Sequence, residues 1–157
     1  MNKAAVIQKI LEALQSELET YVRAAKFSHA EATAEENRAE NKYDTRGLEA
    51  SYLAAGQANK VMELESAIEA FENLQDQTTT GAIEIGSLVE LEQDDFVELY
   101  LIGPTAGGTE VVLNEKEVLV ITPESPLGSQ LMDQETGDQL TLELGGRQQK
   151  ATVLSVK

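Results

Sequence analysis

EENRAENKYDTRGLEASY, residues 35–52, lies midway between two long helical patterns and decides how the chain folds. The stretch is rich in acidic, amide and small residues, and Gly47 is the first glycine in the chain. Asp44 and Thr45 favour a turn, because their side-chain oxygens can bond free backbone N–H groups. We therefore interpret this stretch as the tip of an antiparallel helical hairpin, with its turn near residues 40–49.

The segments on either side of the tip have the apolar spacing of long helices. No proline or glycine interrupts residues 1–46, and apolar residues recur there at intervals of three and four up to about residue 40. A second such pattern runs from Leu48 to about Asp76. Small apolar residues replace large ones toward the tip, so the distal end is expected to be slender. The sequence predicts a helical hairpin over residues 1–78.

Beyond the polar segment 78–81 the apolar period changes from three or four to two, which is typical of strands. Ser125 and Pro126 are expected at the N-cap and first position of one short helix. Gly145 and Gly146, between two alternating runs, predict a tight hairpin. The expected second domain, residues 82–157, is a small antiparallel sheet with a short helix, so the fold class is α+β.

The composition restricts the kinds of partner and site. The chain has a net charge of −16, and both halves are acidic, with 8 basic and 14 acidic side chains in residues 1–78. This charge disfavours binding to free nucleic acid and favours a partner with a basic channel or divalent cations. Cysteine is absent and His29 is the single histidine, so thiolate and histidine-rich metal sites are excluded.

Two features bear on where the protein is expected to work. No apolar run approaches the roughly 20 residues needed to span a bilayer. The N-terminus lacks the uninterrupted apolar core and cleavage site of a secretory signal. We expect a cytoplasmic protein without a membrane partner.

The C-terminal run, residues 121–156, contains Ser125-Pro126-Leu127-Gly128, Leu131, the Gly137-Asp138 turn, the Gly145-Gly146 hairpin and a closing strand. In these features the run closely resembles the end of the Gre family of bacterial transcript-cleavage factors. Further upstream, Ile85-Gly86-Ser87-Leu88-Val89 resembles the domain entry of the family, and Tyr100-Leu101-Ile102-Gly103 resembles its central strand. Together with the helical hairpin, the resemblance extends over nearly the whole chain.

This resemblance implies an FKBP-like C-terminal domain that docks at the rim of the secondary channel of bacterial RNA polymerase. It also implies that the hairpin enters the channel, where two tip acids help to hold a second Mg²⁺ of the polymerase and stimulate hydrolysis of backtracked RNA. The chemistry is reasonable, because Mg²⁺ prefers carboxylate oxygens and two metals stabilise the attacking and leaving oxygens. The chain is then a monomeric elongation factor that is not itself an enzyme and has no cofactor of its own.

The tip departs from the family pattern Asp-Leu-x-Glu-Asn-Ala-Glu-Tyr. One alignment places Glu40 and Asn41 on the Glu-Asn pair, with Asn37 at the position of the Asp. The other places Asp44 on the Asp, with Glu49 as the nearest second acid, and this one balances the two arms of the hairpin better. The expected metal ligands are therefore Asp44, Glu49 and Glu40. Candidates for polymerase contact are Tyr43, Arg46, Ser125, Pro126, Leu127 and Gly128.

Other functions stay open at this point. The altered tip spacing is compatible with a regulator that occupies the channel without stimulating cleavage. A coiled-coil interaction adaptor with an FKBP-like domain is another alternative, although the small-residue seam and central turn favour an intramolecular hairpin. A prolyl isomerase would need an aromatic-lined pocket, whereas the domain offers only Phe96 and Tyr100.

Overall fold

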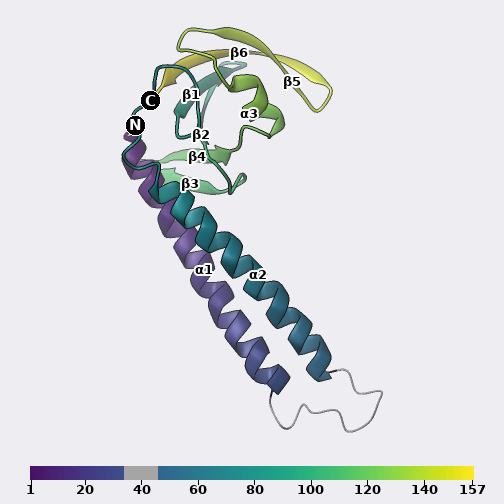
Figure 1. The fold of residues 1–157 in the computed structure, drawn as a ribbon. Helices are drawn as coiled ribbons and strands as arrows, with labels where there is room; N and C mark the ends of the chain where they lie inside the picture. The colour runs from purple at the N-terminus through teal and green to yellow at the C-terminus, as the bar shows by residue number, and fades with distance from the viewer. Residues whose placement is uncertain (34–45) are drawn as a thin grey trace. The chain divides into compact units, whose positions relative to one another are not determined.

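The computed structural model describes the backbone of residues 1–33 and 46–157, and the side chains of these residues except 28, 32 and 46–52 (Figure 1). The helices are α1 (Lys3–Thr33), α2 (Arg46–Glu72) and α3 (Pro126–Leu131). The strands are β1 (Leu88–Gln93), β2 (Phe96–Ile102), β3 (Glu110–Leu113), β4 (Lys116–Ile121), β5 (Gln139–Leu144) and β6 (Arg147–Val156). The fold class α+β and the helical hairpin are confirmed.

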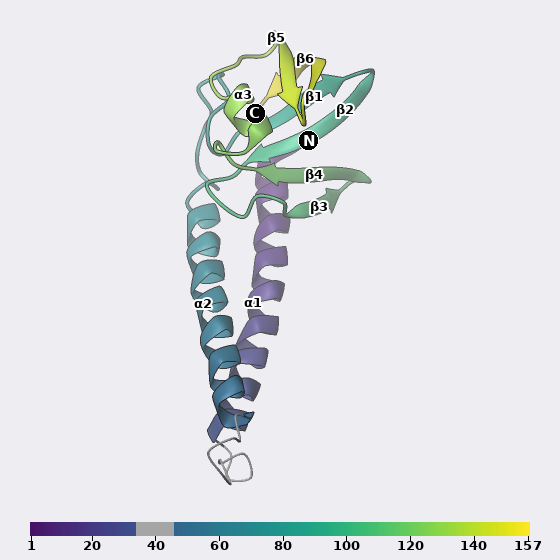
Figure 2. The ribbon, with the colours of Figure 1, turned by 90° about the vertical axis from the view of Figure 1, so that its right-hand side faces the viewer.

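The chain forms two compact units, one of residues 13–68 and one of residues 1–12 with 69–157. In the first unit α1 and α2 run antiparallel, side by side (Figures 1 and 2). Leu14, Leu64 and Ala67 are buried there. Lys60 connects the helices, with Nζ 3.9 Å from Glu17 Oε1 and 6.0 Å from the centre of the Tyr21 ring.

The second unit contains a six-stranded sheet in the order β3-β4-β2-β1-β6-β5. All neighbours are antiparallel except β2 and β4, which run parallel with Leu99 beside Val118. The expectation of a wholly antiparallel sheet is therefore wrong in this detail. Strand β3 pairs antiparallel with β4, on the side of β4 that faces away from β2. The chain reverses direction before β3 and again after it, so β4 runs in the same direction as β2. Alternating apolar residues predict strands but do not specify which strands become neighbours.

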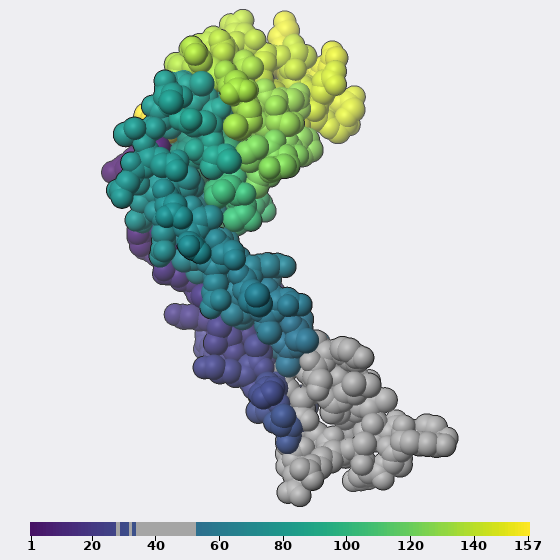
Figure 3. Space-filling view, viewed as in Figure 1, coloured from purple at the N-terminus to yellow at the C-terminus, as the bar shows by residue number. Residues whose placement is uncertain are grey.

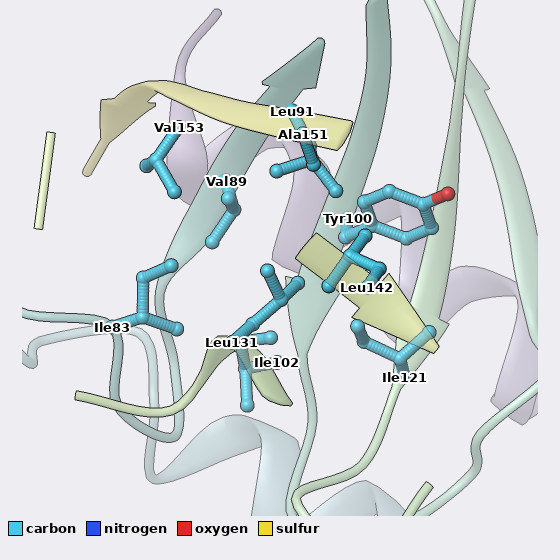
Figure 4. Close-up of a cluster of buried hydrophobic side chains, with 10 residues drawn as sticks. All are labelled: Ile83, Val89, Leu91, Tyr100, Ile102, Ile121, Leu131, Leu142, Ala151 and Val153. Carbon is cyan, nitrogen blue, oxygen red and sulfur yellow. The ribbon is translucent and has the colours of Figure 1, made fainter. Parts of the chain in front are cut away.

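Both faces of the sheet are covered with apolar side chains. One face carries the cluster in Figure 4, into which α3 contributes Leu131. The cluster consists of Ile83, Val89, Leu91, Tyr100, Ile102, Ile121, Leu131, Leu142, Ala151 and Val153. Side chains alternate along a strand, so Leu101 and Val120 point to the opposite face. Gly103 has both Phe71 and Val120 beside it: an added Cβ atom at Gly103 would lie 2.7 Å from Val120 Cγ1 and 2.9 Å from Phe71 Cζ. Phe71 and Val120 are therefore close to each other.

The two helix ends in this unit are tied to each other near the sheet. Lys3 Nζ donates to the backbone oxygen of Gln77 at 2.9 Å. Val6, Ile7 and Ile10 at the start of α1 have no exposed surface. In the described part of the chain, no helix is long and apolar enough to cross a membrane.

Candidate functional site

The short helix α3 begins at the Ser-Pro-Leu-Gly motif, and its N-terminal cap is formed as the sequence predicts. Ser125 is the N-cap residue with extended backbone angles, and Pro126 opens the helix. Ser125 Oγ accepts a hydrogen bond from the Gly128 N–H at 3.0 Å and donates one to the Thr122 oxygen at 2.7 Å. One hydroxyl thus fixes both the first turn of α3 and the loop before it.

Gly128 is buried where the first turn of α3 lies against the preceding loop. A Cβ atom at this position would lie 1.9 Å from the Thr122 oxygen and 2.8 Å from Ser125 Oγ. Both distances are far below van der Waals contact, and the nearer atom belongs to the backbone, which cannot swing aside as a side chain can. The glycine of the motif is therefore required by packing.

Gln130 fastens the other side of α3 to the edge strand β5. Its Oε1 accepts from the Glu143 N–H at 2.7 Å, and its Nε2 donates to the Glu143 oxygen at 3.0 Å. The amide thus pairs with the strand as a neighbouring backbone would. Leu131, one residue later, is fully buried, so α3 is held in a single orientation over the sheet. Gln130 carried no signal in the sequence, because an isolated glutamine in a polar segment has many possible roles.

The four predicted contact residues of the motif differ in what they offer a partner. Gly128 is buried, Ser125 and Leu127 are half-buried, and Pro126 is exposed. Leu127 also packs against the core cluster. Figure 3 shows that the green segment around α3 reaches the surface of the domain. The accessible part of this site is therefore Pro126 with the outer parts of Ser125 and Leu127.

The predicted residues at the hairpin tip cannot be placed in the same way. Glu40, Tyr43 and Asp44 lie outside the described residues, and Arg46 and Glu49 belong to α2 with side chains that are not described. Within the described part of the chain, no three acidic or histidine side chains are grouped so that they could hold a metal ion. A magnesium role for the tip stays a prediction from the sequence.

A second polar site, which the sequence did not predict, lies on β1 and β2. Glu98 Oε2 accepts from the Tyr100 hydroxyl at 2.7 Å and from Gln93 Nε2 at 3.0 Å. Burial, followed by the hydrogen bond and charge of Glu98, raises the pKa of the Tyr100 hydroxyl. The pairing of Gln93 with Phe96 across the β1–β2 turn brings the amide close to Glu98. This arrangement fixes the Glu98 carboxylate on the rim of a cleft.

The sequence of the whole sheet domain matches a known family. Residues 77–157 match the family model described as transcription elongation factor, GreA/GreB, C-terminal. The chain belongs to the GreA/GreB family of transcription elongation factors. The matched range includes α3 with its cap and every strand, whereas the hairpin tip lies outside it. Membership of the GreA/GreB family is thus carried by the sheet domain.

Solved structures of GreA/GreB relatives resemble this chain over almost its full length. The GreA factor homolog 1 (Gfh1) protein of Thermus thermophilus is 21% identical, with 94% of each chain covered and a TM-score of 0.39. Thermus aquaticus Gfh1 is 22% identical, with 99% of this chain and 96% of that chain covered and a TM-score of 0.40. Identities and scores this low carry no functional information. Among curated proteins, no sequence matches this chain significantly.

Proposed function

We propose that this chain binds bacterial RNA polymerase as a monomer, with its sheet domain at the rim of the secondary channel and its helical hairpin inside the channel. The match of residues 77–157 to the GreA/GreB family carries this proposal. Factors of this family act on RNA polymerase, and the chain adds a hairpin with helices of 31 and 27 residues. At 1.5 Å per residue such helices are roughly 40–47 Å long, which suits a probe that reaches into a deep cavity.

The docking part of the proposal rests on the exposed surface of α3. Pro126 is exposed at the start of a helix whose position is fixed by Ser125, Gly128 and Gln130. A rigid, apolar, exposed residue loses little conformational entropy on binding, which makes it suitable as a contact. We therefore assign Pro126, with Leu127 beside it, to the contact with polymerase.

The catalytic part of the proposal rests on the tip acids. Asp44 and Glu49, with Glu40 as a further candidate, would supply carboxylate oxygens to a Mg²⁺ ion shared with the polymerase. The polymerase would supply the remaining ligands and the RNA, so the chain needs no active site of its own. Two carboxylates suit this role, because Mg²⁺ is usually held by one or two protein carboxylates together with substrate phosphates and water.

The test is RNA cleavage in a stalled, backtracked polymerase complex, with wild-type protein and Asp44→Asn. Wild type is expected to accelerate cleavage, and Asp44→Asn to lose most of that acceleration while it still binds polymerase. Asp76→Asn, which removes the same charge from an exposed position after α2, is the matched control and should retain wild-type cleavage. Absence of polymerase binding by the wild-type protein would refute the proposed function as a whole.

The departure of the tip from the family pattern favours a second candidate function. In that case the chain occupies the channel and competes with other channel-binding factors without stimulating cleavage. Wild type would then bind polymerase but leave the cleavage rate unchanged, and Asp44→Asn would behave as wild type does. The same experiment therefore separates the two functions.

A further inference from the structure

A cleft opens in the sheet where two β-hairpins diverge. Strands β2 and β4 pair from Leu99 and Val118 onward, and the residues before these belong to two separate hairpins, β1–β2 and β3–β4. Figure 2 shows both hairpin ends on the same side of the domain. The cleft between them has a volume of about 580 Å³ and lies outside the α3 site. Its lining consists of residues 97–100, Glu110 and residues 115–119.

The cleft combines an apolar floor with an acidic rim. Val118 and Tyr100 are buried and Leu119 is half-buried, whereas Val97 at the entrance is 52% exposed. Four glutamates and one lysine complete the lining, namely Glu98, Glu110, Glu115, Glu117 and Lys116. The volume is within the range of clefts that bury most of a drug-sized ligand.

Three of the glutamates project from the same face of the sheet. Leu119 lies opposite Glu110 and beside Tyr100 in the strand register. Side chains two residues apart on a strand share a face, so Glu98 and Glu117 lie on the face of Tyr100 and Leu119. Like charges on neighbouring strands destabilise a sheet. None of these three carboxylates forms an ion pair with another described residue. The repulsion among the three glutamates is therefore not offset by a positive charge in the described part of the chain.

We propose that this cleft binds an extended, lysine- or arginine-bearing segment of a protein partner. A cation entering the cleft would relieve the repulsion among Glu98, Glu110 and Glu117 and bond to their carboxylates. Alternate residues of an extended segment point the same way, so apolar side chains between the basic ones would reach Val97 and Val118, which lie on the other face of the sheet. Nucleic acid is a poor occupant, because its phosphates would be repelled by the same carboxylates.

Glu98 is the carboxylate best prepared for this role. The Tyr100 hydroxyl and the Gln93 amide both bond to Oε2, and this holds the side chain in place without a partner. A fixed acceptor loses less conformational entropy on binding than a free one. The inference does not depend on the proposed function, because it uses residues of β2, β3 and β4 that neither the α3 contact nor the hairpin tip includes.

The probe for the test is a fluorescein-labelled peptide of alternating lysine and valine, titrated with the full-length protein at low salt. The variant Glu110→Gln with Glu117→Gln removes two rim charges, and we expect it to weaken binding about tenfold, as loss of two partly exposed charge pairs does. The matched control is Glu65→Gln with Glu124→Gln, which removes two exposed charges outside the cleft and should keep the wild-type affinity. A peptide of alternating glutamate and valine should not bind.

Amide chemical shifts measured by NMR during the titration locate the peptide independently of any substitution. The proposal expects the largest changes in β2 and β4 around the cleft. It is overturned if the lysine peptide does not bind, if both double variants weaken binding equally, or if the shifts concentrate elsewhere. Equal weakening would mean that the net charge of −16 attracts the peptide without a site. Thermal unfolding of each variant shows that it is folded, and polymerase binding is measured separately, so failure here does not decide the proposed function.

Discussion

Replacing Gly128 with alanine should destabilise the sheet domain far more than one added methyl group normally does. The new Cβ atom would lie 1.9 Å from the Thr122 oxygen, so the first turn of α3 must move by about 1 Å or more to restore van der Waals contact. Overpacking of this kind costs about 1–3 kcal/mol. The shift also strains the hydrogen bond from the Gly128 N–H to Ser125 Oγ, and loss of an N-cap costs about 1 kcal/mol.

The expected loss in free energy of unfolding for Gly128→Ala is therefore about 2–4 kcal/mol, a large part of the usual stability of a domain. Urea unfolding followed by NMR signals of the sheet amides measures it for this unit alone, and the midpoint should fall by about 1 M or more. Ser129→Ala is the control, because Ser129 is exposed and donates only one local bond to the Pro126 oxygen. A loss below about 1 kcal/mol for Gly128→Ala would refute the assignment of this glycine to packing.

Three further changes test other parts of the structure. Pro126→Ala should change stability by less than about 1 kcal/mol, since the residue is exposed, yet weaken polymerase binding about fivefold in a direct titration. Gly56→Ala should raise the melting temperature of α2 in circular dichroism by about 2–4 °C, because nothing lies within 4 Å of the new Cβ atom and alanine favours helix by about 1 kcal/mol. The pKa of Tyr100 is raised, so the folded state holds its proton more tightly than the unfolded state, and stability should fall as the pH rises above about 10. Urea midpoints between about pH 8 and 11 should show this fall in wild type and a smaller one in Tyr100→Phe.

The local parts of the fold could be predicted because their causes are local. Ser125 and Pro126 occupy the predicted cap and first helical position, since a hydroxyl and a fixed backbone angle suit these positions in any short helix. Gly145 and Gly146 both have positive φ angles, 57° and 76°, in the turn that joins β5 and β6. Such a turn requires residues that adopt this conformation without strain, which a pair of glycines indicates directly.

The long-range parts could not be predicted, because the strand pattern alone does not identify neighbours. The parallel pairing of β2 with β4 places Glu98 next to β4, and no feature of the segment around either strand indicates this. The cleft and its acidic rim follow from that pairing, so they were missed together. Gln130 was missed for a related reason, because it bonds to the backbone of Glu143, which only the tertiary structure brings near.

The motif that resembles the Gre family is largely a packing motif, and this separates evidence for the family from evidence for the function. Ser125 and Gly128 are explained by the cap and by the close approach to Thr122, so selection for folding alone would retain them. A protein of this fold would therefore keep the motif whether or not it stimulated RNA cleavage. The residues that distinguish the two proposed activities are the tip acids such as Asp44, because only the stimulation of cleavage requires them. Their substitution, with the fold shown to be intact, is therefore the decisive comparison for function.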